Sequence, residues 1–242
     1  IWHAMQGYWA GVHPESELAR RWPLMHNRNC IRPWLGAEDA EVDLHLPDPN
    51  ATASFYLEFY DLLRESGVDM VKVDGQSALE RFTGGKLDRV RSMHQYQEAL
   101  QGAAAAHLNG QTLHCMSHGS DVIFNLDYSM VIRNSSDYLP GWNRKGHQQH
   151  IINNTFNAVY LSLFGLPDWD MFQSCHLHSE FHAAARALSG GPIYVSDVPG
   201  TQDFDLIERL VCFEKGAASV LRCPQPALPS PASLYGDPGR SR

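Results

Sequence analysis

Two acidic residues in this sequence occupy positions from which they could carry out glycoside chemistry. Asp74 ends the apolar segment Val71-Lys72-Val73, and Asp137 lies four residues after Arg133. Retaining glycosidases need such a pair, because one carboxylate attacks the anomeric carbon while the other protonates the departing oxygen. We therefore consider Asp74 as a nucleophile and Asp137 as a general acid and base.

A basic residue accompanies each of these carboxylates. Lys72 precedes Asp74 by two positions, so both side chains point to the same side of a strand. Its charge could bind sugar hydroxyls and favour the ionised form of Asp74. Arg133 ends a strand predicted over 129–133, so Asp137 falls in the loop that follows. Acidic residues after strands are common, so on spacing alone Asp74 could also cap a helix and Asp137 could be a turn residue.

Short β-branched strands alternate along the chain with helices that could position these residues. Strands are predicted near 2–8, 68–73, 112–116, 129–133, 157–164 and 192–196, and helices over 51–66, 88–108, 147–163, 178–188 and 202–211. This alternation predicts an α/β protein with a parallel sheet. Polar residues gather just after several strands, at the rim where a (β/α)8 TIM barrel places its site. No glycine-rich phosphate loop follows a strand, which disfavours a dinucleotide-binding fold.

The number of strands predicts about the last six units of such a barrel. Residues 1–222 are expected to form a catalytic TIM-barrel domain that is incomplete at its N-terminal side, because Ile1-Trp2-His3 already has the pattern of a strand interior. Residues 223–242 contain five prolines and are expected to be a linker or the start of a C-terminal β-domain.

The helix predicted over 51–66 has apolar residues at a helical spacing. They are Phe55, Phe59, Leu62 and Leu63. The segment Asp48-Pro49-Asn50 is expected to cap its start, and Gly67 is expected to end it.

Composition excludes several classes of partner. The formal net charge of −8, without a run of basic residues, disfavours nucleic acid. No apolar run reaches 18 residues, so no membrane span is predicted. The five cysteines are scattered and odd in number, which disfavours a disulfide framework and weakly favours a reducing, cytoplasmic compartment.

Histidines and paired aspartates raise the question of a metal site. The residues that raise it are His114, His118, His147, His150, Cys175, His176 and His178, and none has the paired spacing of a structural zinc site. Asp168 and Asp170 form a short acidic motif that is also found in metal-dependent nucleotide-sugar transferases. We predict no metal and no other cofactor.

Several segments together resemble the raffinose synthase and seed imbibition protein group of glycoside hydrolase family 36. The segments are Trp2-His3-Ala4, Gly7 to Val12, Gly67 to Asp74, Cys115 to His118, Arg133 to Asp137, Pro167 to Ser174, and His182 to Asp197. They cover nearly the whole chain in the same order as in that family.

The resemblance implies a (β/α)8 barrel that acts on α-linked galactose by a retaining double displacement. Its nucleophile falls on Asp74 and its acid/base on Asp137, while Lys72 and Arg133 bind the sugar. The implied substrate is an α-galactoside oligosaccharide; the oligomeric state is left open.

The resemblance also implies further sugar contacts. Trp9 and Cys115 match positions that contact galactose, and Trp169 and Asp170 match a loop that shapes the pocket. The two tryptophans could instead be core aromatics, and Cys115 could be a buried small hydrophobe.

The sequence departs from the family pattern at several points. Ser136 stands where many relatives have a first aspartate, and Gly75 stands where they often have an apolar residue. The Asp-Asp-Gly-Trp segment that holds galactose hydroxyls is absent. Asn134 and Ser135 replace the Val-Gly that synthases tend to have, which favours hydrolysis of terminal galactose. Galactosyl transfer as in raffinose synthase, or a non-catalytic carbohydrate-binding barrel, are the alternatives.

Overall fold

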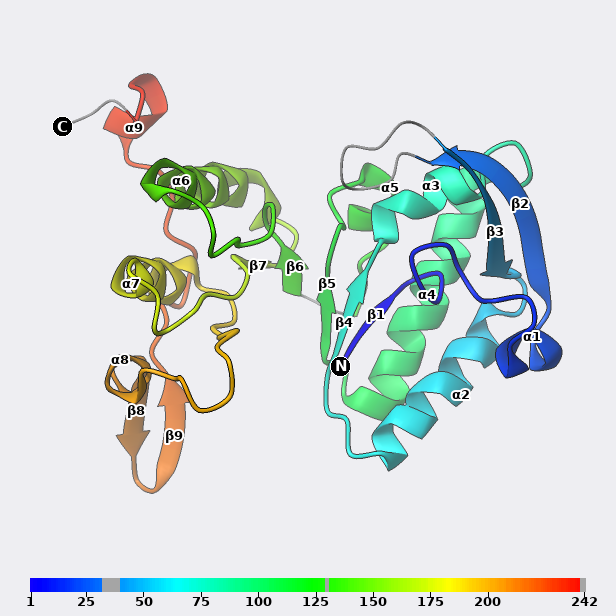
Figure 1. Ribbon diagram of the computed structural model, residues 1–242, viewed down its shortest axis with the longest axis horizontal. Coiled ribbons are helices and arrows are strands. Elements are labelled where there is room, and N and C mark those ends of the chain that lie inside the picture. Colours follow the sequence, from blue (N-terminus) through cyan, green and yellow to red (C-terminus); the bar gives the residue numbers. More distant parts are fainter. Residues whose placement is uncertain (32–39, 129–130, 240–242) are drawn as a thin grey trace. The chain divides into compact units, whose positions relative to one another are not determined.

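The computed structural model of the chain describes residues 1–31, 40–128 and 131–239. The chain divides into two compact units, Ile1–Met130 and Val131–Arg242, and each carries parallel strands flanked by helices (Figure 1). The elements of the first unit are β1 (Trp2–Ala4), α1 (Glu17–Arg21), β2 (Leu24–Ile31), β3 (Ala40–Pro47), α2 (Thr52–Glu65), β4 (Val71–Asp74), the 3-10 turn η1 (Gln76–Ala78), α3 (Leu79–Phe82), α4 (Arg89–Leu108), β5 (Thr112–His114) and α5 (Ser120–Ile123). Those of the second unit are β6 (Val131–Arg133), α6 (Arg144–Leu161), β7 (Leu166–Asp168), α7 (Ser179–Ser189), α8 (Phe204–Glu208), β8 (Val211–Glu214), β9 (Ala217–Val220) and α9 (Pro231–Tyr235).

The parallel strands of the first unit place Asp74 at their carboxyl edge. β4 pairs in parallel with β1 on one side and with β5 on the other. In this register Asp74 lies opposite Ala4, and the backbone N–H of Cys115, just after β5, donates to the carbonyl of Val73 at 2.8 Å. The predicted parallel sheet is therefore confirmed for this unit.

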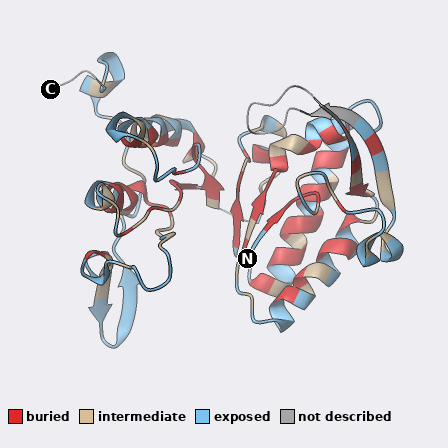
Figure 2. Ribbon diagram, viewed as in Figure 1, coloured by how far each residue is buried: buried red, intermediate tan, exposed pale blue. Residues whose placement is uncertain are grey.

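The core of the first unit lies between these strands and two long helices. α2 and α4 pack against each other, and their inner faces are buried, as Figure 2 shows. Val71 and Val73 of β4 are fully buried with Tyr56, Tyr60 and Leu100 of the helices. The alternate burial of apolar residues fixes which face of β4 turns to the core.

The helix predicted over 51–66 is present as α2, but its cap and its apolar stripe differ from the prediction. Ala51 occupies the N-cap position without a side-chain hydrogen bond, and Asp48 instead accepts from the backbone N–H of Asn50 at 2.8 Å. Leu62 is 59% exposed, whereas the tyrosines at 56 and 60 take the buried positions. Gly67 follows the helix with φ of +80°, a conformation that suits glycine, so the predicted end is confirmed.

A hairpin between α1 and α2 was not predicted. β2 and β3 pair in antiparallel fashion, with Leu24 opposite Pro47. Leu44 and Leu46 are fully buried, whereas Asp43 is exposed and His45 is only partly buried, which is the two-residue period of a half-buried strand. That signal was present in the sequence but short.

In the second unit the position of one predicted strand is wrong. β6 pairs in parallel with β7, and Arg133 lies opposite Asp168. The strand predicted near 157–164 falls instead in the last turns of α6 and the turn after it, because Ala158 and Leu161 continue the helical face into the core. The strand begins only at Leu166.

The segment predicted as a strand over 192–196 is joined to its neighbour by a single parallel bridge, between Phe172 and Val195. Gly191 precedes it and lies so close to β7 that a Cβ there would stand 2.1 Å from the carbonyl oxygen of Pro167. The described residues thus contain three paired parallel strands in one unit and two in the other. The closed eight-unit barrel stays a prediction.

The C-terminal segment contains an antiparallel hairpin that was not predicted, β8 with β9, and both strands are largely exposed (Figure 2). Beyond it, Cys223 and Ala227 donate backbone hydrogen bonds to the carbonyls of Ala187 and Leu188 at 2.8 and 2.9 Å. The assignment of residues 223–242 to a linker or a further domain stays a prediction. Within the described ranges, no helix is both long and apolar enough to cross a membrane.

Candidate active site

Asp74 is held at the end of β4 by two neutral donors. Asp74 is buried, with 9% of its surface exposed. The indole Nε1 of Trp2 donates to Oδ2 at 3.1 Å, and the backbone N–H of Gly75 donates to Oδ1 at 2.7 Å. These hydrogen bonds, one on each oxygen, fix the orientation of the carboxylate.

Aromatic rings surround the donor that holds Asp74. Trp2 lies on β1, and its ring centroid is 5.4 Å from that of Trp9 and 6.0 Å from that of Tyr8. Trp9, predicted to bind sugar, is half-buried, and Tyr8 is 61% exposed. The three rings could offer apolar faces to a ligand beside Asp74. The sequence indicates Trp2 only as part of the segment Trp2-His3-Ala4, and its contact with Asp74 comes from the structure.

Gly75 explains one departure from the family pattern. Its φ is +70°, and a Cβ there would lie 2.9 Å from Nε2 of Gln6. The Gln6 side chain is fully buried and therefore fills the space that a side chain at position 75 would take.

The structure places Lys72 and Cys115 in the same unit as Asp74. Lys72 is half-buried at the centre of β4, two residues before Asp74, and lies opposite Trp2 and Leu113 of the neighbouring strands. Cys115 is 3% exposed just beyond β5. Lys72 therefore lies on the strand that contains Asp74 and Cys115 directly after the neighbouring strand, and their contacts with sugar stay predictions.

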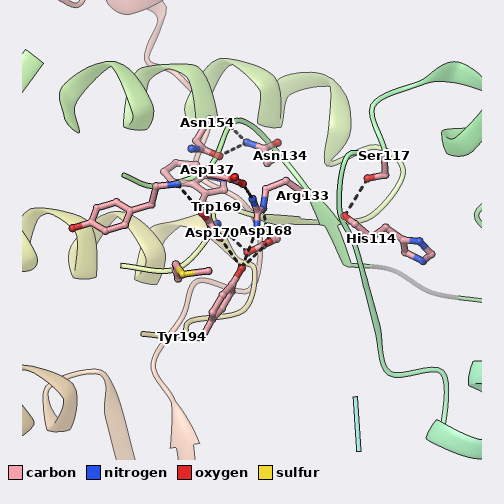
Figure 3. A network of polar contacts seen from close by, with 12 residues as sticks. His114, Ser117, Arg133, Asn134, Asp137, Asn154, Asp168, Trp169, Asp170 and Tyr194 are labelled. Carbon is pink, nitrogen blue, oxygen red and sulfur yellow. Dashed lines mark hydrogen bonds and ion pairs between the residues drawn. The ribbon is translucent and has the colours of Figure 1, made fainter. Parts of the chain in front are cut away.

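Arg133 in the second unit gathers three carboxylates (Figure 3). Its Nε donates to Asp168 Oδ2 at 2.8 Å, its Nη2 to Asp170 Oδ1 at 2.6 Å and its Nη1 to Asp137 Oδ1 at 2.6 Å. Arg133, Asp168 and Asp170 are at most 2% exposed, whereas the Asp137 side chain is 73% exposed. A buried arginine thus presents one edge to an accessible carboxylate and the other edges to buried ones.

Asp170 links this cluster to the loop of Asp137. Its Oδ2 accepts from the backbone N–H of Tyr138 at 2.7 Å, while its own N–H donates to Asp168 Oδ1 at 2.9 Å. Both of its carboxylate oxygens therefore accept hydrogen bonds from the protein. Its φ of +66° is unusual for a residue with a side chain and indicates a conformation that the surroundings enforce.

A second buried arginine fixes the backbone of that strained residue. Arg186 is fully buried and donates to the carbonyls of Trp169, Asp170 and Met171 at 2.9, 3.1 and 3.0 Å. Burial lowers the pKa of Arg186 to about 10, and Asp170 and Asp168 oppose that shift, so the guanidinium stays charged at neutral pH.

Arg186 also sets the protonation of two histidines. It donates to Nδ1 of His182 at 2.6 Å and to Nε2 of His150 at 3.1 Å, so both nitrogens act as acceptors. Burial, followed by the charge of Arg186, lowers the pKa of His182 to about 2 and that of His150 to about 4. With its proton on Nε2, His182 donates to Nδ1 of His147 at 2.8 Å.

Two residues of the Arg133 cluster were not predicted as site residues. The sequence indicates Asp168 only as part of an acidic motif and of the segment Pro167 to Ser174. Tyr194, whose hydroxyl lies 3.0 Å from Asp168 Oδ2 and 3.2 Å from Asp170 Oδ1, had been noted only as part of a strand. Burial raises the pKa of Tyr194, and Asp168 raises it further, so the hydroxyl keeps its proton.

Trp169 and Asn134 both face the interior of the second unit. Trp169 is 2% exposed and packs with Ala158 and Ala185. The amide of Asn134 donates to the backbone carbonyl of Asn154 at 2.6 Å, so this side chain is directed to α6 (Figure 3). Over the ranges that the structure describes, no group of three or more His, Cys, Asp or Glu side chains is placed to hold a metal ion.

Comparison with known proteins places these features in a family context. Residues 1–242 match the family model described as raffinose synthase or seed imbibition protein Sip1. The chain is 38% identical over 247 residues to "Probable galactinol–sucrose galactosyltransferase 6" of Arabidopsis thaliana, covering 99% of this chain and 32% of that protein. It is 32% identical over 259 residues to a galactinol–sucrose galactosyltransferase of Oryza sativa subsp. japonica, covering 98% and 32%. The chain thus spans about a third of the length of these relatives.

The fold is similar to that of an α-galactosidase. The structure of TtGalA from Thermus thermophilus, solved in complex with stachyose, superposes with a TM-score of 0.58 at 15% identity over 82% of this chain and 46% of that protein. This likeness extends to the fold and agrees with the predicted α/β class.

Proposed function

The chain belongs to the raffinose synthase or seed imbibition protein Sip1 family, and from this premise we propose that it contributes the catalytic residues of an α-galactosyl transfer. The donor in this proposal is galactinol and the acceptor is sucrose, as the names of both plant relatives state for those proteins. The observation that carries the proposal is the family match over residues 1–242.

Asp74 acts as the nucleophile in the proposed reaction, and Asp137 as the acid/base. The Asp74 carboxylate attacks the anomeric carbon of galactose, and the bond from that carbon to the departing oxygen breaks as Asp137 gives its proton to that oxygen. A hydroxyl of the acceptor then gives its proton to Asp137 and attacks the same carbon, which breaks the bond to Asp74. The net configuration at the anomeric carbon is retained, as in other double displacements by two carboxyl groups.

The environments of the two carboxylates suit these roles. Asp74 is buried, and hydrogen bonds from Trp2 and Gly75 hold its carboxylate in one orientation, which suits a nucleophile. Asp137 is exposed and can exchange protons with solvent and with an acceptor. Lys72 and Arg133 are proposed to bind the galactose hydroxyls, and Trp9 and Cys115 to line the pocket.

The roles of Asp170 and Trp169 are better explained as support than as direct contact with sugar. Both oxygens of Asp170 accept hydrogen bonds from Arg133 and Tyr138, and Trp169 is packed in the core. We propose that they hold the Asp137 loop in place.

The preference for hydrolysis that the sequence suggested rested on Asn134 and Ser135. Asn134 is fully buried and bonded to Asn154, and Ser135 is 9% exposed. Because Asn134 is directed to α6 and Ser135 is buried, these two residues do not by themselves choose between water and sucrose as acceptor. Because both plant relatives are named as galactosyltransferases, we propose transfer in place of hydrolysis, with hydrolysis as the second candidate.

The test uses the full chain with 4-nitrophenyl α-galactoside, and then with galactinol in the presence and absence of sucrose. Asp74→Ala is expected to abolish turnover, and azide is expected to restore it partly as a galactosyl azide. Asp69→Ala is the matched control, because Asp69 is exposed and lies five residues earlier in the same segment. Asp137→Ala should depress turnover, whereas Asp205→Ala on α8 should not.

Product analysis separates the candidate functions. A trisaccharide formed from galactinol and sucrose supports transfer, and free galactose in its place supports hydrolysis. Turnover that survives Asp74→Ala would exclude this nucleophile. Sugar binding without turnover by the wild type would favour the non-catalytic alternative.

A further inference from the structure

The hydroxyl of Tyr194 closes a ring of hydrogen bonds around one side of Arg133. Arg133 Nε donates to Asp168 Oδ2, and Nη2 donates to Asp170 Oδ1. The Tyr194 hydroxyl lies between those same two oxygens, at 3.0 and 3.2 Å, and accepts from Nη2 at 3.4 Å (Figure 3). The proposed mechanism assigns no role to this hydroxyl.

The ring brings together two buried carboxylates that repel each other. Asp168 and Asp170 are both buried, and one guanidinium faces them together with Asp137. The hydroxyl proton of Tyr194 adds a neutral donor between the two buried oxygens, where it reduces their mutual repulsion. The pKa of Tyr194 is raised by burial, so this proton is retained across the range in which enzymes work.

The ring is connected to Asp137 by two routes. Arg133 Nη1 donates directly to Asp137 Oδ1, and Asp170 Oδ2 accepts from the N–H of Tyr138, the residue after Asp137. The guanidinium is planar, so the two bonds made by Nε and Nη2 determine the direction in which Nη1 points.

We infer that Tyr194 is a positioning residue, which fixes the plane of the Arg133 guanidinium and thereby the carboxyl group of Asp137. The inference rests on the proposed function, because it concerns the residue proposed there as acid/base. Tyr194 acts through Arg133, Asp168 and Asp170, and needs no contact with substrate.

The leaving group of the substrate provides the first test. An α-galactoside with an acidic phenol, such as 4-nitrophenyl α-galactoside, needs little protonation from Asp137, whereas methyl α-galactoside needs a full proton transfer. Tyr194→Phe removes only the hydroxyl and is expected to lower kcat/KM for the methyl galactoside by about fivefold more than for the nitrophenyl galactoside. A purely structural defect would lower both equally.

Tyr160→Phe is the matched control, because Tyr160 lies on α6 of the same unit, is 52% exposed and contacts the ring of Phe164. It should leave both rates and their ratio at the wild-type level. An unchanged ratio in Tyr194→Phe, or the same change in Tyr160→Phe, would overturn the inference.

A second measurement is independent of turnover. The NMR signal of the Arg133 Nε–H can be assigned by its loss in Arg133→Lys. This proton should exchange slowly with water in the wild type and at least several times faster in Tyr194→Phe. If the wild type turns over neither galactoside, the proposed function fails, and this exchange rate alone decides whether Tyr194 orients Arg133. Equal exchange rates in the wild type and in Tyr194→Phe would refute the positioning role.

Discussion

The carboxylate of Asp74 and that of Asp137 are held by opposite means. Asp74 is buried, and the donors on its two oxygens are an indole N–H and a backbone N–H, both neutral. Asp137 is exposed, and its partner is a charged arginine that is itself buried among other carboxylates. In one case the carboxylate is in the interior and its donors are neutral. In the other the charge network is in the interior and the carboxylate is at the surface.

This difference indicates what each proposed role requires. A nucleophile needs a fixed orientation, which short, neutral hydrogen bonds give without drawing away its charge. A general acid and base needs access to protons, which an exposed side chain has, together with a fixed support. Since the support of Asp137 contains buried charges, it should be the more costly of the two regions to disturb.

The largest expected effect follows from removing that central cation. Arg133→Met leaves Asp168 and Asp170 buried without their ionic partner, and it should lower the free energy of unfolding by about 3–5 kcal/mol. Urea denaturation followed by circular dichroism measures it. Arg209→Met is the control, because its ion pair with Glu180 is 66% and 74% exposed and should contribute less than about 1 kcal/mol. Equal losses in the two variants would show that the buried ion pairs of Arg133 contribute no more to stability than an exposed one.

The next effect concerns pH and the support of Asp137. The pKa of His182 is lowered by burial to about 2, from its ordinary value of 6.5, so below pH 6.5 the unfolded chain binds a proton that the folded chain does not. The stability due to neutral His182 is therefore complete above pH 6.5 and is lost as the pH falls towards 2, by about 2 kcal/mol at pH 5.

His182→Gln should reduce the slope of the unfolding free energy against pH between pH 6.5 and 5. The reduction should correspond to about one bound proton. Denaturation curves at pH 8, 6.5 and 5 measure this slope. A slope that is the same in the variant and the wild type would show that His182 takes up a proton in the folded state.

A smaller effect is expected at the nucleophile. Trp2→Phe removes one hydrogen bond to Asp74 but keeps an aromatic ring, and it should lower kcat/KM for an aryl galactoside about tenfold, the range for a bond to a charged group. Tyr8→Phe keeps the ring beside Trp2 and should behave like the wild type. If Trp2→Phe is fully active, the backbone N–H of Gly75 suffices to orient Asp74.

The smallest effect tests the turn after Asp74. Gly75→Ala should lower the free energy of unfolding by about 1–2 kcal/mol, because φ is +70° and the new methyl group would contact Gln6. Gly85→Ala isolates the backbone contribution, since Gly85 has φ of +74° with open space around it. Adding Gln6→Ala to Gly75→Ala should remove the contact with Gln6, so the loss in unfolding free energy should fall to that of Gly85→Ala. No recovery would mean that Gln6 moves aside without cost.

Much of the fold could be predicted because it depends on local patterns. The strand ending in Asp74 and the helices α2, α4, α6 and α7 could be predicted from the local sequence, and their ends agree with the structure within a few residues. The hairpin β2–β3 was missed because its strands carry polar and charged residues among the apolar ones. The strand before Asp168 was placed too early because α6 continues its helical period up to Leu161.

The sequence by itself determined the pairs that are close along the chain. Lys72 and Asp74 share a strand, and Arg133 and Asp137 are four residues apart, so their relation is local and visible as spacing. Only the tertiary structure decided that Asp168, Asp170 and Tyr194 close around Arg133 across separations of 35 to 61 residues. It also decided that Trp2 bonds to Asp74 and that Asn134 is directed to α6. Such contacts depend on strand pairing and helix packing, which bring together residues whose distance along the chain carries no trace of their contact.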